Sequence, residues 1–273
     1  MPLSVIKSIT LIGAGKMGGA MLHGWLKKGL AAKAVTVVDP HVGSEAFSML
    51  IEFGIRHLKS VDELETPPEV VVIAIKPQHM GELLPDLSRR IAKDTLVLSI
   101  AAGTPLDKIA SGLNAGPVVR VMPNTPAQVG QGMSVAVANT AVTDDHRRLV
   151  SELLNAIGRS AWVRDEALMD AVTAVSGSGP AYVFNLVEAM AAAAVKAGLP
   201  ADLAMQLSRQ TVVGAGALLG SSALDVATLR KNVTSPGGTT AAALAILMGE
   251  HGLEPVLTDA VAAAAQRSRE LAG

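Results

Sequence analysis

The segment SITLIGAGKMGGAMLHGWLKKG, residues 8–29, decides how the first part of the chain is interpreted. Its opening run, 8–13, is mostly apolar and β-branched, which is typical of a strand buried on both faces of a parallel sheet. A helical pattern follows at 16–28 and stops at Gly29. The glycine-rich turn between them therefore joins a buried strand directly to a helix.

The turn itself, GAGKMG from Gly13 to Gly18, matches the pattern G-x-G-x-x-G of dinucleotide-binding sites. Gly13 permits the tight turn, Gly15 lets a pyrophosphate approach the backbone, and Gly18 lets the helix pack on the strand. The helix N-terminus supplies N–H groups and a positive dipole end to the phosphates. We interpret this segment as a dinucleotide site, with a purely structural glycine turn as the alternative.

The alternation of strands and helices continues to about Val163. Strands are predicted at 8–13, 35–39, 70–75, 95–100 and 118–122, and further ones at 132–138 and 160–163. After Val163 the strand-like runs stop, and alanine-rich helical segments occupy 180–197, 201–219, 238–248 and 254–271. The sequence thus predicts an α/β fold with a doubly wound sheet in residues 1–163, followed by an all-helical domain in residues 164–273.

Ligands of such sheets bind beyond the carboxyl ends of the parallel strands. The small side chains at 101–102 would leave room for a nicotinamide ring. Lys76 and Pro77 have a simpler alternative, an exposed lysine before a proline that starts a helix. The residues expected to contact the cofactor are Ile12, Gly13, Ala14, Gly15, Lys16, Met17, Gly18, Asp39, Ala74, Ile75, Lys76, Pro77, Ile100, Ala101, Ala102, Pro123 and Asn124.

Asp39 bears on the choice of cofactor. It closes the second predicted strand, about 20 residues after the glycine motif, where an acidic residue binds the ribose of a dinucleotide. A carboxylate there accepts both ribose hydroxyls and repels a 2′-phosphate, so the sequence favours NADH without excluding NADPH. His41 could offset part of the repulsion. The alternative for Asp39 is a solvated turn residue before Pro40.

Composition narrows the remaining possibilities. Charged residues are 17% of the chain, against a typical share of roughly 25%, which suggests that part of the surface is buried against another subunit. A net charge of −1 gives no reason to expect nucleic acid or an anionic membrane as a partner. The chain has no cysteine, so thiolate sites are excluded, and no metal site is expected. Without a signal peptide pattern or a long apolar stretch, a cytoplasmic protein is the default expectation.

The stretch SPGGTT, from Ser235 to Thr240, lies between two helical segments. Its glycines expose consecutive backbone N–H groups, and a helix start that follows them binds a carboxylate well. The hydroxyls of Ser235 and the threonines can orient a polar atom without titrating near neutral pH. Taken alone, the stretch could equally be an ordinary helix cap.

In combination, these motifs resemble pyrroline-5-carboxylate reductase, the last enzyme of proline biosynthesis. The resemblance covers essentially the whole chain. It rests on LIGAGKMG near the start, AIKP at 74–77, SIAAGTPL at 99–106, VMPNTPAQVGQGM at 121–133, VSGSGPAYVFNLVEAM at 175–190 and LRKNVTSPGGTT at 229–240.

The resemblance implies a reductase that uses NAD(P)H, with a Rossmann-type domain and a helical dimerisation domain. It also implies a homodimer, which in this family often assembles further into a decamer. The substrate, 1-pyrroline-5-carboxylate, is expected to be held by Ser235, Gly237, Gly238, Thr239 and Thr240. Thr240 would hydrogen-bond the ring nitrogen and is the expected catalytic residue, while Ser235 and the backbone around Gly238 and Thr239 would hold the carboxylate.

The chain departs from better-known members at two positions. Asp39 replaces a small polar residue that in some members contacts the 2′-phosphate, and Val61 stands where some have asparagine near the adenosine.

Two competing functions remain. A hydroxyacid dehydrogenase would need a lysine as general acid early in the helix after 177–179, but the first lysine there is Lys196. A dinucleotide sensor without turnover would have no use for SPGGTT.

Overall fold

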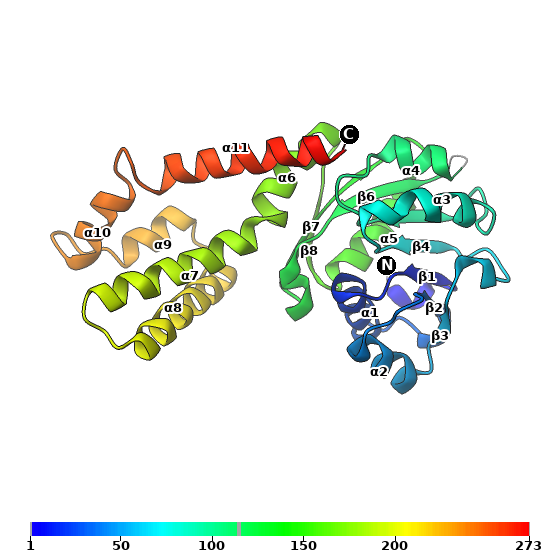
Figure 1. The fold of residues 1–273 in the computed structure, drawn as a ribbon, viewed down its shortest axis with the longest axis horizontal. Coiled ribbons are helices and arrows are strands. Elements are labelled where there is room, and N and C mark those ends of the chain that lie inside the picture. The colour runs from blue at the N-terminus through cyan, green and yellow to red at the C-terminus, as the bar shows by residue number, and fades with distance from the viewer. Residues whose placement is uncertain (1, 114–115, 273) are drawn as a thin grey trace. The chain divides into compact units, whose positions relative to one another are not determined.

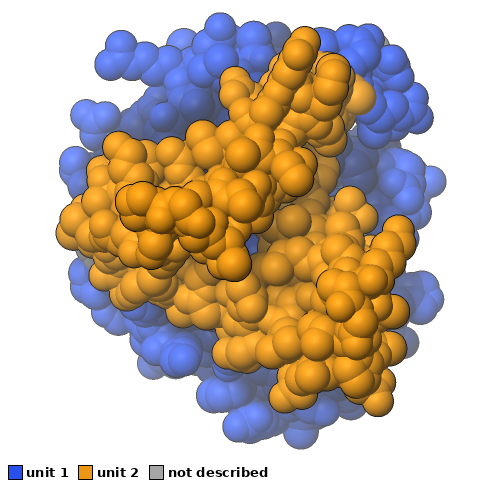
Figure 2. Space-filling model, turned by 90° about the vertical axis from the view of Figure 1, so that its left-hand side faces the viewer, with its two compact units in different colours: residues 1–177, 265–273 blue, residues 178–264 orange. Residues whose placement is uncertain are grey.

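The computed structural model describes residues 2–113 and 116–272 and is drawn in Figure 1. The chain divides into two compact units, which Figure 2 colours separately. The first unit comprises residues 1–177 with 265–273, and the second comprises residues 178–264. Each unit is described in turn.

The first unit contains an eight-stranded sheet with the order β3-β2-β1-β4-β5-β6-β7-β8. From β3 to β6 all neighbouring strands are parallel, whereas β7 is antiparallel to β6 and β8 is parallel to β7. The strand bounds are β1 Ile9–Ile12, β2 Val35–Val38, β3 Arg56–Leu58, β4 Val70–Ile73, β5 Leu96–Ser99, β6 Val118–Met122, β7 Gly132–Ala138 and β8 Gly158–Trp162. The predicted strands are confirmed. β3 was not predicted, because its residues Arg56 and His57 are polar and do not form the apolar run that indicates a buried strand.

Helices cover both faces of this sheet (Figure 1). Alternate residues of β4 show why, because successive side chains of a strand point to opposite faces. Val70 and Val72 belong to a core shared with α1 and α5, whereas Val71 and Ile73 belong to a second core shared with α3 and α4. The helices of this unit are α1 Lys16–Lys27, α2 Ser44–Phe53, α3 Met80–Ser88, α4 Leu106–Gly112 and α5 Asp144–Asn155. The predicted doubly wound sheet is therefore confirmed.

Helical structure takes over after β8. Three short elements follow in the first unit: a 3-10 helix at Glu166–Leu168, α6 at Met169–Val172 and a π-helical turn at Thr173–Gly177. The last residues of the chain, the helical stretch 265–272, also belong to the first unit. The second unit consists of helices: α7 Gly179–Lys196, α8 Ala201–Ser221, α9 Val226–Asn232, α10 Thr239–Leu247 and the first part of α11 Leu253–Ala272. The expectation of an all-helical C-terminal region is confirmed.

The second unit has almost no core within a single chain. Among residues 178–264 the buried ones are Ala191, Ala204, Ser208 and Gly252, none of them a large apolar residue. Large apolar side chains are instead exposed, for example Phe184 at 65% and Ile246 at 78%. Burial of apolar surface is the main force that stabilises folded helices, so these helices lack their usual packing in a single chain.

No helix in the described part of the chain combines the length and the apolar character needed to cross a membrane.

Candidate active site

The glycine turn after β1 has three glycines with three different surroundings. Gly13 has φ of +92°, and an added Cβ would lie 2.7 Å from the carbonyl oxygen of Ala74 on the neighbouring strand segment. A Cβ on Gly18 would lie 2.1 Å from the carbonyl oxygen of Gly13. Gly15 is the N-cap of α1 with ordinary extended angles, and nothing lies within 4 Å of an added Cβ. Gly13 and Gly18 are thus required by the fold, whereas Gly15 borders open space that a phosphate could fill.

Asp39 follows β2 and is tied to this turn. Its Oδ2 accepts a hydrogen bond of 2.7 Å from the backbone N–H of Ala14, and its Oδ1 accepts one of 2.8 Å from the N–H of His41. The carbonyl oxygen of Asp39 lies 2.8 Å from Nε2 of His57. Each carboxylate oxygen retains a free lone pair for a ribose hydroxyl. The acid therefore holds the glycine turn against β2 in addition to facing the cavity beside it.

A cavity of about 770 Å³ opens beside the turn and Asp39. This volume lies within the range of about 300–1,000 Å³ that is usual for ligand sites. The predicted cofactor residues that line it are Ile12, Gly13, Gly15, Asp39, Ala74, Ile75 and Lys76. Side chains that the sequence pattern missed line it as well: Lys59, Ser60, His79, Glu82, Leu83 and Asp86. Lys59 and Ser60 follow directly after β3, the strand that the apolar pattern did not reveal.

The other predicted cofactor residues lie outside this cavity. Lys16 and Met17 begin α1, and Pro77 begins a short 3-10 helix at Pro77–His79. Residues 100–102 follow β5, with Ala101 buried, and Pro123 and Asn124 follow β6. Because β4, β5 and β6 are parallel neighbours, their carboxyl ends share one edge with the cavity residues that follow β4. The cavity and the residues that follow β5 and β6 are therefore neighbours along that edge, where ligands of parallel sheets usually bind.

The stretch SPGGTT forms a tight turn and then the start of α10. The N–H of Gly238 donates to the carbonyl oxygen of Ser235 at 3.0 Å, and Gly237 between them has φ of +69°, which favours glycine. Gly238 is the N-cap of α10 and has no side-chain capping bond, so the first N–H groups of the helix have no protein partner among the described residues. Ser235 and Thr239 are exposed, and Thr240 is half-buried.

The helix before this turn is capped in the usual way. The hydroxyl and the N–H of Thr228 both donate to the carboxylate of Asp225, and these bonds lower the pKa of that carboxyl. The contrast with α10 is informative, because α9 uses a protein carboxylate where α10 leaves its N-terminus open. An external carboxylate would complete α10 as Asp225 completes α9.

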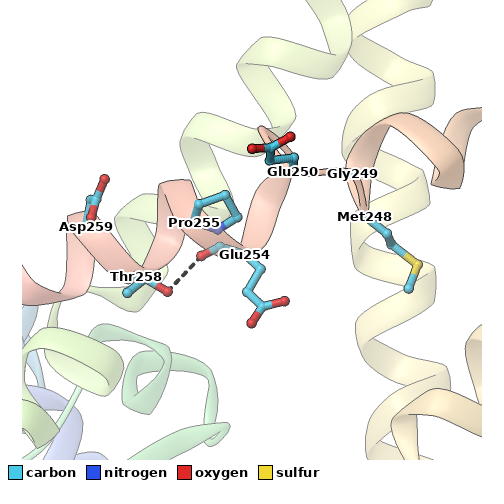
Figure 3. A pocket seen from close by; sticks show the side chains of 7 residues that line it. All are labelled: Met248, Gly249, Glu250, Glu254, Pro255, Thr258 and Asp259. Carbon is cyan, nitrogen blue, oxygen red and sulfur yellow. Dashed lines mark hydrogen bonds between the residues drawn. The ribbon is translucent and has the colours of Figure 1, made fainter.

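A second cavity, of about 510 Å³, lies in the helical unit between the end of α10 and the start of α11 (Figure 3). Glu250, Glu254 and Asp259 line it, and Thr258 donates only to the carbonyl oxygen of Glu254. These acidic walls disfavour an anionic substrate. In the described part of the chain, no cluster of three or more histidine, cysteine or carboxylate residues could hold a metal ion.

Comparison with known proteins identifies the family. Residues 166–271 match the family model for pyrroline-5-carboxylate reductase dimerisation, and residues 8–103 match the model for NADP oxidoreductase, coenzyme F420-dependent. The chain is 41% identical to pyrroline-5-carboxylate reductase of Pseudomonas aeruginosa, over 97% of this chain and 96% of that one. The chain belongs to the pyrroline-5-carboxylate reductase family. The resemblance that its motifs suggested is confirmed.

Solved structures agree with this assignment. A pyrroline-5-carboxylate reductase from Coxiella burnetii superposes with a TM-score of 0.91 at 32% identity, covering 97% of this chain and 98% of that one. The Plasmodium falciparum pyrroline carboxylate reductase, solved with NADP bound, gives a TM-score of 0.81 at 29% identity over 97% and 98% of the two chains. The protein is thus an oxidoreductase of the NAD(P)H-dependent type, and the hydroxyacid dehydrogenase and sensor alternatives are not favoured. The match of residues 166–271 to the family model for dimerisation suggests self-association through the helical region.

Proposed function

We propose that the protein reduces 1-pyrroline-5-carboxylate to L-proline with NAD(P)H, the last step of proline biosynthesis. The observation that carries this proposal is the open N-terminus of α10, with hydroxyl groups around it and no ionisable side chain from Thr234 to Thr240. A carboxylate that accepts two of these N–H groups gains about 1.5–3 kcal/mol from each charge-assisted bond. Ser235, Gly237, Gly238 and Thr239 would hold the carboxylate in this way.

The reaction needs little acid catalysis from the protein. When bound, NAD(P)H supplies a hydride to the imine carbon, and the nitrogen of a cyclic imine can already carry its proton. Thr240 would accept or donate a hydrogen bond at that nitrogen and so orient the ring. Correct placement of two reactants can account for about 7–11 kcal/mol of a barrier. A site of glycines and hydroxyls is therefore sufficient for this chemistry.

The turn after β1 and the strand ends would hold the dinucleotide. The N–H groups at the start of α1 would bind the pyrophosphate beside Gly15, and Asp39 would bind the adenosine ribose. The ends of β5 and β6, with the small residues Ala101 and Ala102, would leave room for the nicotinamide ring. Lys76 and Pro77, which lie between β4 and the end of the following 3-10 helix, would border the ribose and phosphate that join the adenosine and nicotinamide halves of the cofactor.

The substrate proposal is tested by steady-state assays with 1-pyrroline-5-carboxylate and with small 2-keto and 3-hydroxy acids, each with NADH and NADPH. We expect oxidation of the reduced cofactor with the imine only. Turnover of a hydroxyacid or keto acid without turnover of the imine would contradict the proposal.

We further propose that Asp39 makes NADH at least as good a cofactor as NADPH. Repulsion between its carboxylate and a 2′-phosphate in a partly exposed site is worth about 1–2 kcal/mol after screening, so Asp39→Ser should raise the ratio of kcat/KM for NADPH to that for NADH about 5- to 30-fold. Lys59 and His41 line the same cavity and leave NADPH usable. The serine also loses the bond to Ala14, so NADH use should fall.

Asp39→Asn serves as the control for that second effect. It removes the charge and keeps a side chain long enough to accept from Ala14, so the cofactor ratio should rise while the melting temperature stays close to that of the wild type. If neither variant changes the cofactor ratio, Asp39 does not face the adenosine ribose.

A homodimer is the third part of the proposal. The missing core of the helical unit supports it, because two copies could bury each other's exposed apolar side chains. Phe184→Lys should therefore convert the dimer, or a decamer of five dimers, into smaller species by sedimentation velocity and remove activity. Phe47→Lys is the matched control, since Phe47 is also exposed, at 49%, but lies on α2 of the first unit. A stable and active wild-type monomer would contradict the proposal.

A cytoplasmic location remains the expectation from the sequence.

A further inference from the structure

Asn124 follows β6, and its side-chain amide joins two segments that are distant in sequence. The N–H of Met133, in β7, donates to its Oδ1 at 2.8 Å. Its Nδ2 donates to the carbonyl oxygen of Ser176 at 3.2 Å and lies 3.3 Å from the Ser176 hydroxyl oxygen. The backbone carbonyl of Asn124 also accepts from the N–H of Ala127 at 3.1 Å. The amide is thus committed to holding other parts of the first unit together.

Ser176 belongs to the π-helical turn Thr173–Gly177. Such π-helical turns are rare and occur frequently at functional sites. Gly177 brings this turn directly onto the end of β6, since an added Cβ there would lie 2.3 Å from Cε of Met122. Together, Asn124 and Gly177 place the π-helical turn at the carboxyl end of β6.

That end of β6 borders the edge of the sheet where the nicotinamide half of the cofactor is expected. We propose that Asn124 is a positioning residue for hydride transfer, which acts by clamping the π-helical turn through Ser176 to the carboxyl end of β6. The inference rests on the proposed reductase activity. Loss of the clamp would shift the nicotinamide side of the site and leave the adenosine side, built on β1 to β4, unchanged.

Asn139, which follows β7, provides a matched control at the opposite end of β6. Its Oδ1 accepts from the N–H of Val118 at 3.1 Å, and its Nδ2 donates to the carbonyl oxygen of Gly116 at 2.8 Å. Like Asn124, it accepts from one backbone N–H and donates to one backbone carbonyl, but at the amino end of β6, away from the ligand edge, and without a hydroxyl contact. Asn124→Asp and Asn139→Asp both keep the acceptor and replace the donor with an oxygen.

The test compares melting temperature, the KM for NADH and kcat with 1-pyrroline-5-carboxylate in both variants. We expect losses of melting temperature of the same order, because each variant loses the donor group of one side-chain amide and keeps its acceptor. Only Asn124→Asp should lower kcat, by about 10- to 100-fold, since small misplacements of reactants have effects of that size. The KM for NADH should stay near the wild-type value in both. An equal loss of kcat in the two variants, or an unchanged kcat in Asn124→Asp, would overturn the proposal.

Two further measurements cover the remaining outcomes. If Asn124→Asp does not fold, Ser176→Ala removes only the hydroxyl contact and should lower kcat about two- to tenfold at an unchanged melting temperature, while an unchanged kcat would refute the clamp. If the wild type does not reduce the imine, the proposed function fails, but hydrogen exchange still tests the clamp. Amides of residues 173–177 should exchange faster in Asn124→Asp than in Asn139→Asp, and equal exchange would count against the clamp.

Discussion

Thr240→Val is expected to lower kcat/KM for 1-pyrroline-5-carboxylate by about 10- to 150-fold, the equivalent of one lost hydrogen bond of about 1.5–3 kcal/mol. Thr240 is the second residue of α10, and its hydroxyl makes no hydrogen bond to another described residue. Valine keeps the β-branched shape, so the helix should form as before. If the bond to the ring nitrogen strengthens in the transition state, most of the loss falls on kcat, with the KM for NADH unchanged.

Thr239→Val is the matched control for this experiment. Thr239 precedes Thr240 in the same helix and is exposed, and only its backbone N–H is expected to contact the substrate carboxylate. Its replacement should leave kcat/KM within about threefold of the wild-type value, as expected for a surface change of less than about 0.5 kcal/mol. Wild-type kinetics in Thr240→Val would show that Thr240 is a helix residue only, and the catalytic assignment would have to move.

Gly15→Val is expected to raise the KM for NADH by at least about 100-fold, because its side chain would occupy the place of the pyrophosphate and remove two charge-assisted bonds of about 1.5–3 kcal/mol each. The free protein should tolerate the change. Gly15 has φ of −68° and ψ of −167°, which valine adopts readily, and no atom lies within 4 Å of an added Cβ. The melting temperature without cofactor should therefore change little, and cofactor binding by fluorescence titration should be lost.

Gly43→Val isolates the contribution of the ligand. Gly43 is likewise the N-cap of a helix, α2, with φ of −67°, ψ of 155° and nothing within 4 Å of an added Cβ, but it does not line the cavity. Any cost of placing valine at a helix N-cap is shared by the two variants. A similar KM for NADH in both would mean that the pyrophosphate does not bind beside Gly15.

Much of the fold could be predicted because it depends on neighbouring residues. The apolar runs of β1, β4 and β5 identify strands buried on both faces, and each run lies within a few residues of the turn that ends it. The roles of Gly13 and Gly18 follow from the motif in the same way. β3 was not predicted because Arg56 and His57 are polar, and because its pairing with β2 depends on residues far from it in the chain.

The candidate site was predicted in part. The motif and Asp39 indicated the adenosine side, but Lys59, Ser60 and His79 enter the cavity only because β3 and the 3-10 helix after β4 lie beside Gly15 in space. The hydrogen bond from the N–H of Ala14 to Asp39 joins residues 25 positions apart, so no local sequence pattern predicts it. SPGGTT was recognisable as a possible anion site, yet only the structure shows that α10 has no side-chain cap.

By itself, the sequence determined the family, the order of strands and helices, and the use of a dinucleotide, because turn chemistry and apolar periodicity act over short stretches of chain. The low share of charged residues also indicated a surface buried against another subunit. The tertiary structure shows where the candidate for such a surface lies, because residues 178–264 bury no large apolar side chain in a single chain. It also decided that Asn124 contacts Ser176 across 52 positions, because such a contact depends on how the whole chain folds back on itself.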